Sequence, residues 1–400
     1  MARRTLAHRV HDALTSGMSA FRYLDRYYRD AFDRWARPPI VAVVQAIINA
    51  RRPRERIGLA EERLFPGEEQ ATRKIIEDQG AFMRRTYAVS VAERVGNTKT
   101  YGAVRGEFEV LYGLPEQLRV GVFAVPRRYP AYVRFGGPGP LSPPDIRDNG
   151  LLSVGVKLMG VEGPKLLEED ERHTQDFLGL SSPTFTTPDV MENVKLQRRL
   201  REGLPGFYFL DPRDSHYLDA IMQGLWARAQ SSPLEARYWS TVPYLMGEGQ
   251  AMQFQLVPRS SERTPIAKRP EPNYLRHAMA RTLRSHPWEF DFRVQLQTDA
   301  HRMPIENASV IWPEKLSPPV TVARLHLPVQ EFDSPEQLAF ARSLSFQPWH
   351  SIAEHRPLGS QNRARKAIYY ELSKLRQELN GDVRVEPDGG EALPYRSAAR

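Results

Sequence analysis

The chain of 400 residues contains no cysteine. This absence excludes disulfides, thiolate catalysis, iron–sulfur clusters and cysteine-ligated zinc sites. Long hydrophobic runs are also missing, because the apolar segment from Ile40 to Ala50 is too short to span a bilayer. The first ten residues carry charge but lack the apolar stretch of a secretory signal. We therefore expect a cytoplasmic protein, with peripheral membrane contact left open.

Several catalytic signatures are missing as well. The sequence has no HExxH zinc motif, no phosphate-binding glycine loop and no nucleophile elbow around a serine. The loop at 136–140 holds two prolines and no helix is expected after it, so it is not a dinucleotide fingerprint. Metalloprotease, nucleotide-binding and serine-hydrolase functions are therefore not indicated.

The positive charge is concentrated at one end of the chain. The formal net charge is +8, and residues 1–60 contribute about seven of it through twelve arginines, no lysine and five acids. The other 340 residues are nearly neutral. The basicity therefore belongs to an N-terminal segment, and no nucleic-acid-binding motif accompanies it.

Residues 1–60 are interpreted as a basic, amphipathic helical arm. Apolar side chains recur every three or four residues between Leu6 and Trp35, which predicts a helix or helix pair over 6–37, ended by Pro38-Pro39. Such an arm could pack on the body or on a second subunit, and a homo-oligomer stays open. The alternative is contact with an anionic membrane surface.

Short strand patterns in two batches predict a closed antiparallel β-barrel with surrounding helices, an α+β fold. The barrel domain is expected over 61–379 and a polar, mobile tail over 380–400. Helices are expected over 63–93, 187–232, 272–285 and 361–379. The expected strands are 106–111, 120–125, 131–135, 152–159, 289–297, 308–312 and 320–327.

The most informative motif is Arg365-x-x-x-Tyr369 in the last predicted helix. Residues four apart share one face of a helix, so the guanidinium and the phenol can meet. A cation held against a phenol favours the phenolate and lowers its pKa from about 10. A phenolate is a hard anionic donor that suits ferric iron. On a surface helix, however, the same pair is usually a solvated cation beside a ring.

Six segments in order resemble the catalase superfamily, in particular its small haem proteins that include peroxidases and coral allene oxide synthase. The resemblance covers roughly residues 63–378 and implies the barrel fold and a bound haem b. Its segments are Arg94–Phe108, Tyr132–Gly136, Gly155–Val161, Thr174–Phe185, Pro304–Glu306, and Ser345–Gly359 with the helical segment Asn362–Tyr369.

The resemblance assigns haem-binding roles residue by residue. It implies that Tyr369 is the axial ligand of the ferric iron and that Arg365 is the arginine paired with it. Arg94 and Arg134 match the arginines that hold the haem propionates. That role is physically sensible because buried carboxylates need fixed cationic donors.

The distal side departs from the family pattern. The family's distal histidine falls on Asn97 and its assisting asparagine falls on Ser181, and no histidine lies between His11 and His173. An asparagine can orient a peroxide by hydrogen bonds but cannot accept its proton at neutral pH. Losing a general base typically costs a factor of about 100 to 10,000 in rate.

We therefore expect a haem-dependent oxidoreductase with weak or divergent activity on hydrogen peroxide or on organic or lipid hydroperoxides. Either peroxidase chemistry or hydroperoxide rearrangement fits. The alternative is a haem-binding protein without catalysis, such as a sensor, carrier or partner-binding module. A scaffold without haem is disfavoured because barrel packing does not require Arg365 and Tyr369.

Overall fold

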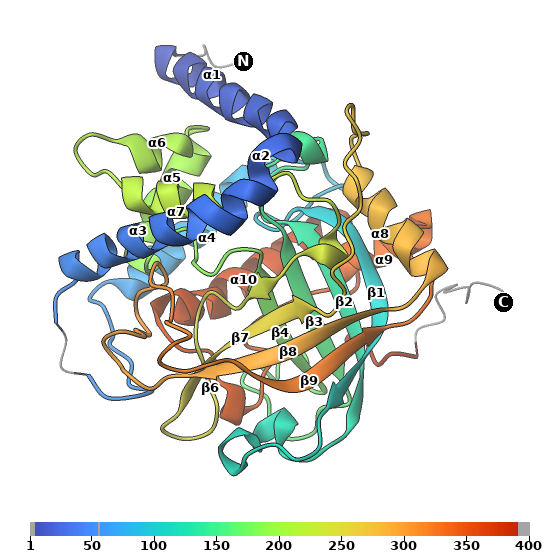
Figure 1. The fold of residues 1–400 in the computed structure, drawn as a ribbon. Coiled ribbons are helices and arrows are strands. Elements are labelled where there is room, and N and C mark those ends of the chain that lie inside the picture. The colour runs from blue at the N-terminus through green and yellow to red at the C-terminus, as the bar shows by residue number, and fades with distance from the viewer. Residues whose placement is uncertain (1–4, 55–56, 391–400) are drawn as a thin grey trace.

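The structure is a computed structural model and describes residues 5–54 and 57–390. A closed antiparallel β-barrel lies at its centre, and helices cover the outside (Figure 1). The ring closes because β5 pairs with both β4 and β7. The short strand β6 (Tyr244–Leu245) pairs with β7 beside the ring. This architecture confirms the predicted fold class. The eight strands of the ring are β1 (Lys99–Val110), β2 (Arg128–Gly137), β3 (Ser153–Met159), β4 (Thr174–Leu180), β5 (Tyr238–Trp239), β7 (Ala251–Pro258), β8 (Trp288–Leu296) and β9 (Val320–Leu327).

Aromatic side chains form a large part of the core. The rings of Phe108 and Phe292 lie 5.2 Å apart between centroids, and those of Phe177 and Phe292 lie 5.0 Å apart. All three side chains are fully buried. Edge-to-face and tilted aromatic pairs of this kind add to the stabilisation from burial alone. These rings fill the core, so a site for a large ligand must lie elsewhere.

Three helices build a second apolar cluster beside the barrel. It joins α4 (Glu68–Thr86), α5 (Val190–Arg201) and α10 (Ser360–Asn380) through buried residues such as Ile75 and Ile368. The remaining helices of the body are α6 (Gly206–Leu210), α7 (Tyr217–Trp226), α8 (Tyr274–Ser285) and α9 (Pro335–Ser343).

Two carboxylates hold the start of α10. The amide of Gly359 donates to Glu62 at 2.8 Å, and the amide of Ser360 donates to Glu306 at 2.7 Å. Acceptors at a helix N-terminus satisfy amides that have no partner within the helix. Gly359 has φ +86°, and a Cβ there would lie 2.6 Å from the carbonyl oxygen of Ile305. Close packing therefore requires glycine at this point and fixes where α10 begins.

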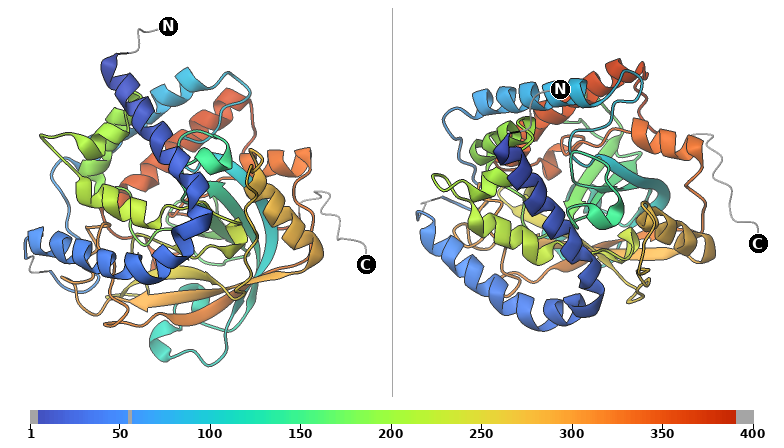
Figure 2. Two further views of the ribbon diagram at one scale, coloured as in Figure 1. Left: turned by 45° about the horizontal axis from the view of Figure 1, so that its top comes forward. Right: turned by 90° about the horizontal axis from the view of Figure 1, so that it is seen from above.

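The N-terminal segment forms α1 (Leu6–Phe21), α2 (Asp25–Ala31) and α3 (Arg37–Arg51), which follow one another across the outside of the body (Figure 2). The expectation that Pro38-Pro39 ends the helix is wrong. Both prolines lie in the first turn of α3, where the missing amide donor costs nothing and φ is already suitable. Val44 and Ile48 of α3 pack with Met222 and Leu225 of α7.

Two predicted strands are absent from the described structure. Gly121 has φ +54° and its neighbours form a 3-10 turn over Gly121–Phe123, so 120–125 is not extended. Residues 308–312 form a turn and an irregular segment, in which Gln45 bonds the backbone of Ser309 and Ile311. Conversely, β7 and α9 were not predicted.

The described part of the C-terminal segment contacts the body, and its expected mobility stays a prediction. The guanidinium of Arg384 pairs with Asp170, and Glu386 accepts from the amide of Arg172 at 2.9 Å. Residues 391–400 lie outside the described residues.

A buried charge network joins β3, β4 and the segment before α10. The ammonium of Lys157 pairs with Glu171 and lies 2.8 Å from Asp176. His350 lies 2.9 Å from Asp176 and 2.7 Å from Asp170. Burial lowers the pKa of His350, but Glu171 and Asp176 outweigh it and raise that pKa above its usual value. Each cation of this network lies beside carboxylates, and this pairing offsets the cost of burying the charges.

Replacing Lys157 by methionine should destabilise the fold by about 3–5 kcal/mol, because buried carboxylates lose their counter-charge. Chemical denaturation at pH 7 measures the loss. The matched control is Lys195→Met on α5, whose ammonium is 38 % exposed and pairs with Glu192 and Asp214. This change should cost less than about 1 kcal/mol. Equal losses for the two variants would contradict the role assigned to Lys157.

Candidate functional site

Arg365 and Tyr369 meet on α10 as the sequence predicts. The Nε and Nη2 groups of Arg365 donate to the hydroxyl oxygen of Tyr369 at 3.2 and 3.1 Å. Its Nη1 donates to the Oδ1 of Asn362 at 3.0 Å. Arg365 is buried, and among the described residues no carboxylate lies within ion-pair distance of it. A phenol, rather than a carboxylate, therefore faces this buried cation.

A second phenol lies near the same guanidinium. Tyr244 of β6 is fully buried, and burial raises its pKa to about 12 although Arg365 lowers it. For Arg365 itself, burial lowers the pKa, but Tyr369 and Tyr244 outweigh this and raise it. The guanidinium therefore stays charged and favours a negative oxygen at its side.

Three further arginines lie near one another, close to the C-terminal end of α9. Arg134 of β2 donates to the carbonyl of Asn97 at 2.8 Å and to the Thr100 hydroxyl at 2.7 Å. Arg376 of α10 donates to the backbone carbonyl of Arg342 and, at 3.2 Å, to that of Ser343. Arg94 donates to the carbonyl of Leu344. We call Arg94, Arg134 and Arg376 the arginine cluster.

The arginine cluster lacks a carboxylate partner. No ion pair to any of its members is found among the described residues, and one nitrogen each of Arg94 and Arg134 is buried without an acceptor. Burial lowers the pKa of Arg134 and of Arg376 to about 10. For Arg94, burial and then the charges of the other two lower the pKa well below its usual value. Such a set is arranged to receive an anion with several oxygens.

Arg376 was missed by the sequence reasoning, although a signal for it was present. It lies seven residues after Tyr369, which is about two helical turns. Asn362, Arg365, Tyr369 and Arg376 therefore share one side of α10. A pattern search that followed the Arg-x-x-x-Tyr face beyond the tyrosine would have found this arginine.

Asn97 and Ser181 lie at the same end of strands β1 to β4. Asn97 precedes β1 in a left-handed conformation with φ +52°, and its side-chain Oδ1 is buried without a hydrogen-bond donor. Ser181 follows β4, where its hydroxyl accepts from the amide of Leu152 at 2.8 Å. No hydrogen bond joins the two side chains in the described chain. Asn97 is thus tied to the arginine cluster through Arg134, whereas Ser181 is held by β3.

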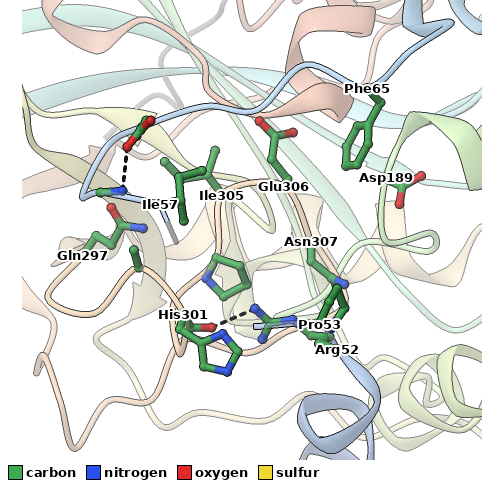
Figure 3. A pocket seen from close by; sticks show the side chains of 14 residues that line it. Arg52, Pro53, Ile57, Phe65, Asp189, Gln297, His301, Ile305, Glu306 and Asn307 are labelled. Atoms are coloured by element: carbon green, nitrogen blue, oxygen red, sulfur yellow. Dashed lines mark hydrogen bonds between the residues drawn. The ribbon is translucent and has the colours of Figure 1, made fainter. Parts of the chain in front are cut away.

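A cavity of about 190 Å³ lies between the segment 52–65 and the segment 297–307 (Figure 3). Arg52 crosses it to donate to the carbonyl of His301 at 2.8 Å. None of the six predicted site residues lines this cavity. It therefore belongs to the packing of the N-terminal arm and not to the candidate site.

Two groups, each made of two carboxylates and one histidine, have ligand atoms close enough together to hold a metal ion. In each group a lysine ammonium already pairs with the carboxylates. Lys157 occupies the group of Glu171, Asp176 and His350. Lys195 occupies the group of Glu192, Asp214 and His216. We assign no metal to either group.

Comparison with solved structures finds the same architecture in catalases. A fungal catalase gives a TM-score of 0.56 at 15 % identity, covering 83 % of this chain and 68 % of that one. A bacterial catalase gives 0.54 at 15 %, covering 84 % and 67 %. Catalase A from Saccharomyces cerevisiae gives 0.56 at 14 %, covering 82 % and 68 %.

This chain has a catalase-like fold. At such low identity the likeness concerns the fold alone. No protein-family model matches the sequence, and no curated protein matches it.

Because the arginine cluster has no carboxylate partner in the described part of the chain, removing one of its charges should cost little stability. In ligand-free protein, Arg376→Met should change stability by less than about 1 kcal/mol, because relief of an unpaired buried charge offsets the lost hydrogen bonds. Denaturant melts of parent and variant at pH 7 measure the change, and a loss of more than about 3 kcal/mol would contradict the absence of a counter-charge.

Proposed function

We propose that this chain binds haem b through α10 and the arginine cluster. Tyr369 would be the axial ligand, since its oxygen already accepts two N–H groups from a buried cation. A cation that donates to a phenol oxygen favours the phenolate form, and a phenolate is the better ligand for ferric iron. The buried charge of Arg365, which faces phenols and an amide but no carboxylate, is the observation that carries the proposal.

The arginine cluster supports the same ligand. Haem b carries two propionates, which need fixed cationic donors when they enter a protein. Arg94, Arg134 and Arg376 supply three guanidiniums, two of them with a buried nitrogen that has no acceptor. Without an anion, their mutual repulsion costs stability. Two bound carboxylates would offset most of this positive charge and relieve the repulsion.

The activity that fits best is a weak or divergent reaction with hydroperoxides. Ferric haem supplies the redox centre when bound. Asn97 would orient a peroxide through its amide, whose Oδ1 is free to accept a hydrogen bond. Ser181 can donate one hydrogen bond, although its oxygen is engaged by Leu152. Neither side chain can take a proton at neutral pH, so rapid dismutation of hydrogen peroxide is not expected.

A second candidate function rests on the same distal residues. A haem protein without a proton acceptor beside the ligand could serve as a sensor, carrier or partner-binding module. The absorption spectrum of haem-loaded protein before and after peroxide distinguishes the two functions. A Soret band that shifts with peroxide favours the oxidoreductase, and a stable Soret band that ignores peroxide favours the binding protein.

Tyr369→Phe should reduce haem retention at least about tenfold while leaving the fold intact, because the iron loses its anionic ligand. Haem content per chain and circular dichroism measure the two effects. The matched control is Tyr370→Phe at the next residue of α10, where the ammonium of Lys374 lies 5.0 Å from the centroid of the ring. Equal haem content in the two variants would refute Tyr369 as the ligand.

Asn97→His should raise the turnover of hydrogen peroxide by about a hundredfold, because it adds a proton acceptor. Histidine tolerates the left-handed backbone at this position better than most residues. Oxygen release from haem-loaded protein measures turnover, with Asn97→Gln as the control that keeps an amide. If both variants behave like the parent at full haem content, the distal assignment of Asn97 is wrong.

A further inference from the structure

The outer side of α3 is apolar although it faces solvent. Its exposed residues from Pro38 to Ala50 carry no charge, and Asn49 is the one with a polar side chain. The inner side is also apolar and packs on α7 through Val44 and Ile48. A helix that is apolar all round normally has partners all round. The exposed residues of this face are Pro38, Pro39, Ile40, Ala42, Val43, Ala46, Ile47, Asn49 and Ala50.

The apolar face continues beyond α3 as exposed aromatic rings. Trp35, just before α3, is 75 % exposed, and Tyr27 and Tyr28 of α2 are also exposed. Large amphipathic rings of this kind prefer the headgroup region of a bilayer. In Figures 1 and 2 the helices α2 and α3 lie on the outside of the body, with α3 reaching toward one edge of the molecule.

Arginines border this face at both ends. Arg34 precedes it, and Arg51 and Arg54 follow it, all three exposed. Most carboxylates of the N-terminal arm already have hydrogen-bond or ion-pair partners. Asp25 accepts from the amide of Ala229, and Asp33 pairs with Arg29 and other arginines. The surface around the apolar face is therefore positive.

We propose that the outer face of α3, with Trp35 and the bordering arginines, docks on an anionic phospholipid surface. The apolar side chains would enter the headgroup and acyl boundary while the arginines meet the lipid phosphates. Among the described residues, no helix is both long and apolar enough to cross a membrane. The contact is therefore peripheral. It does not depend on the proposed haem site.

A partner protein fits this surface less well. A second copy would bring the same arginines to the contact without acids to pair with them, because the neighbouring acids are already engaged. An anionic membrane offers negative charge at every position. Charge complementarity therefore selects lipid.

Co-sedimentation of the full chain with vesicles tests the proposal. The chain should bind vesicles of phosphatidylcholine and phosphatidylglycerol, and bind phosphatidylcholine alone at least about tenfold more weakly. Raising the salt from 0.1 to 0.5 M should weaken binding to the anionic vesicles, because the Debye length shortens with ionic strength and the attraction between arginines and lipid phosphates is screened. Absence of binding to anionic vesicles would overturn the proposal.

A matched pair of valine variants locates the contact. Val43→Glu, at a side chain 60 % exposed on α3, should lower vesicle binding at least about tenfold because a charge enters the apolar face. Val125→Glu, at 59 % exposure in the barrel's 120–126 loop, should leave it unchanged. Circular dichroism checks that both variants fold. Equal vesicle binding by both would overturn the proposal, as would sedimentation velocity showing a dimer that Val43→Glu dissociates.

Discussion

Burying a charged side chain costs free energy unless an opposite charge lies beside it. The Lys157 network and the arginine cluster differ in whether they meet this constraint. The ammonium of Lys157 is enclosed by Glu171 and Asp176, so its network needs nothing from outside. The guanidiniums of Arg134 and Arg376 are buried as well, yet they end on backbone carbonyls and a hydroxyl. Burial without a counter-ion is costly. Beside α10 the fold bears this cost for several guanidiniums together, and an anionic ligand bound there would relieve it.

Helix α10 carries both a member of the arginine cluster and the proposed iron ligand, Tyr369. Its first turn is fixed by Glu62 and Glu306, and its position beside the barrel follows from that attachment. Arg365, Tyr369 and Arg376 then project from one side, at spacings of four and seven residues. One helix thus supplies the oxygen proposed as the axial ligand, the guanidinium that donates to it and one member of the arginine cluster. A shift of α10 would move all three together.

The sequence predicted those features that depend on local patterns or on a motif. The strands around Arg134 and the pair Arg365–Tyr369 were found because alternation and helical spacing are visible in the chain. The expected strand at 120–125 failed because Gly121 turns the backbone, and the buried ring of His355 occupies the space beside it. The helix did not end at Pro38, since proline is tolerated in a first turn. The clustering of arginines from three segments depends on tertiary packing, which no local pattern reports.

The distal residues show why the two sides of the site can differ. Asn97 has a left-handed backbone after Gly96, and its carbonyl accepts from Arg134, so this loop serves the arginine cluster whatever its side chain does. In the proposed site the requirement at Arg365 is electrostatic, and α10 itself supplies both the guanidinium and the phenol oxygen to which it donates. In the proposed site a proton acceptor beside the peroxide is a separate, chemical requirement, and neither Asn97 nor Ser181 supplies one. The proposed anchoring and catalysis would therefore rest on separate groups, and a chain can retain the first while altering the second.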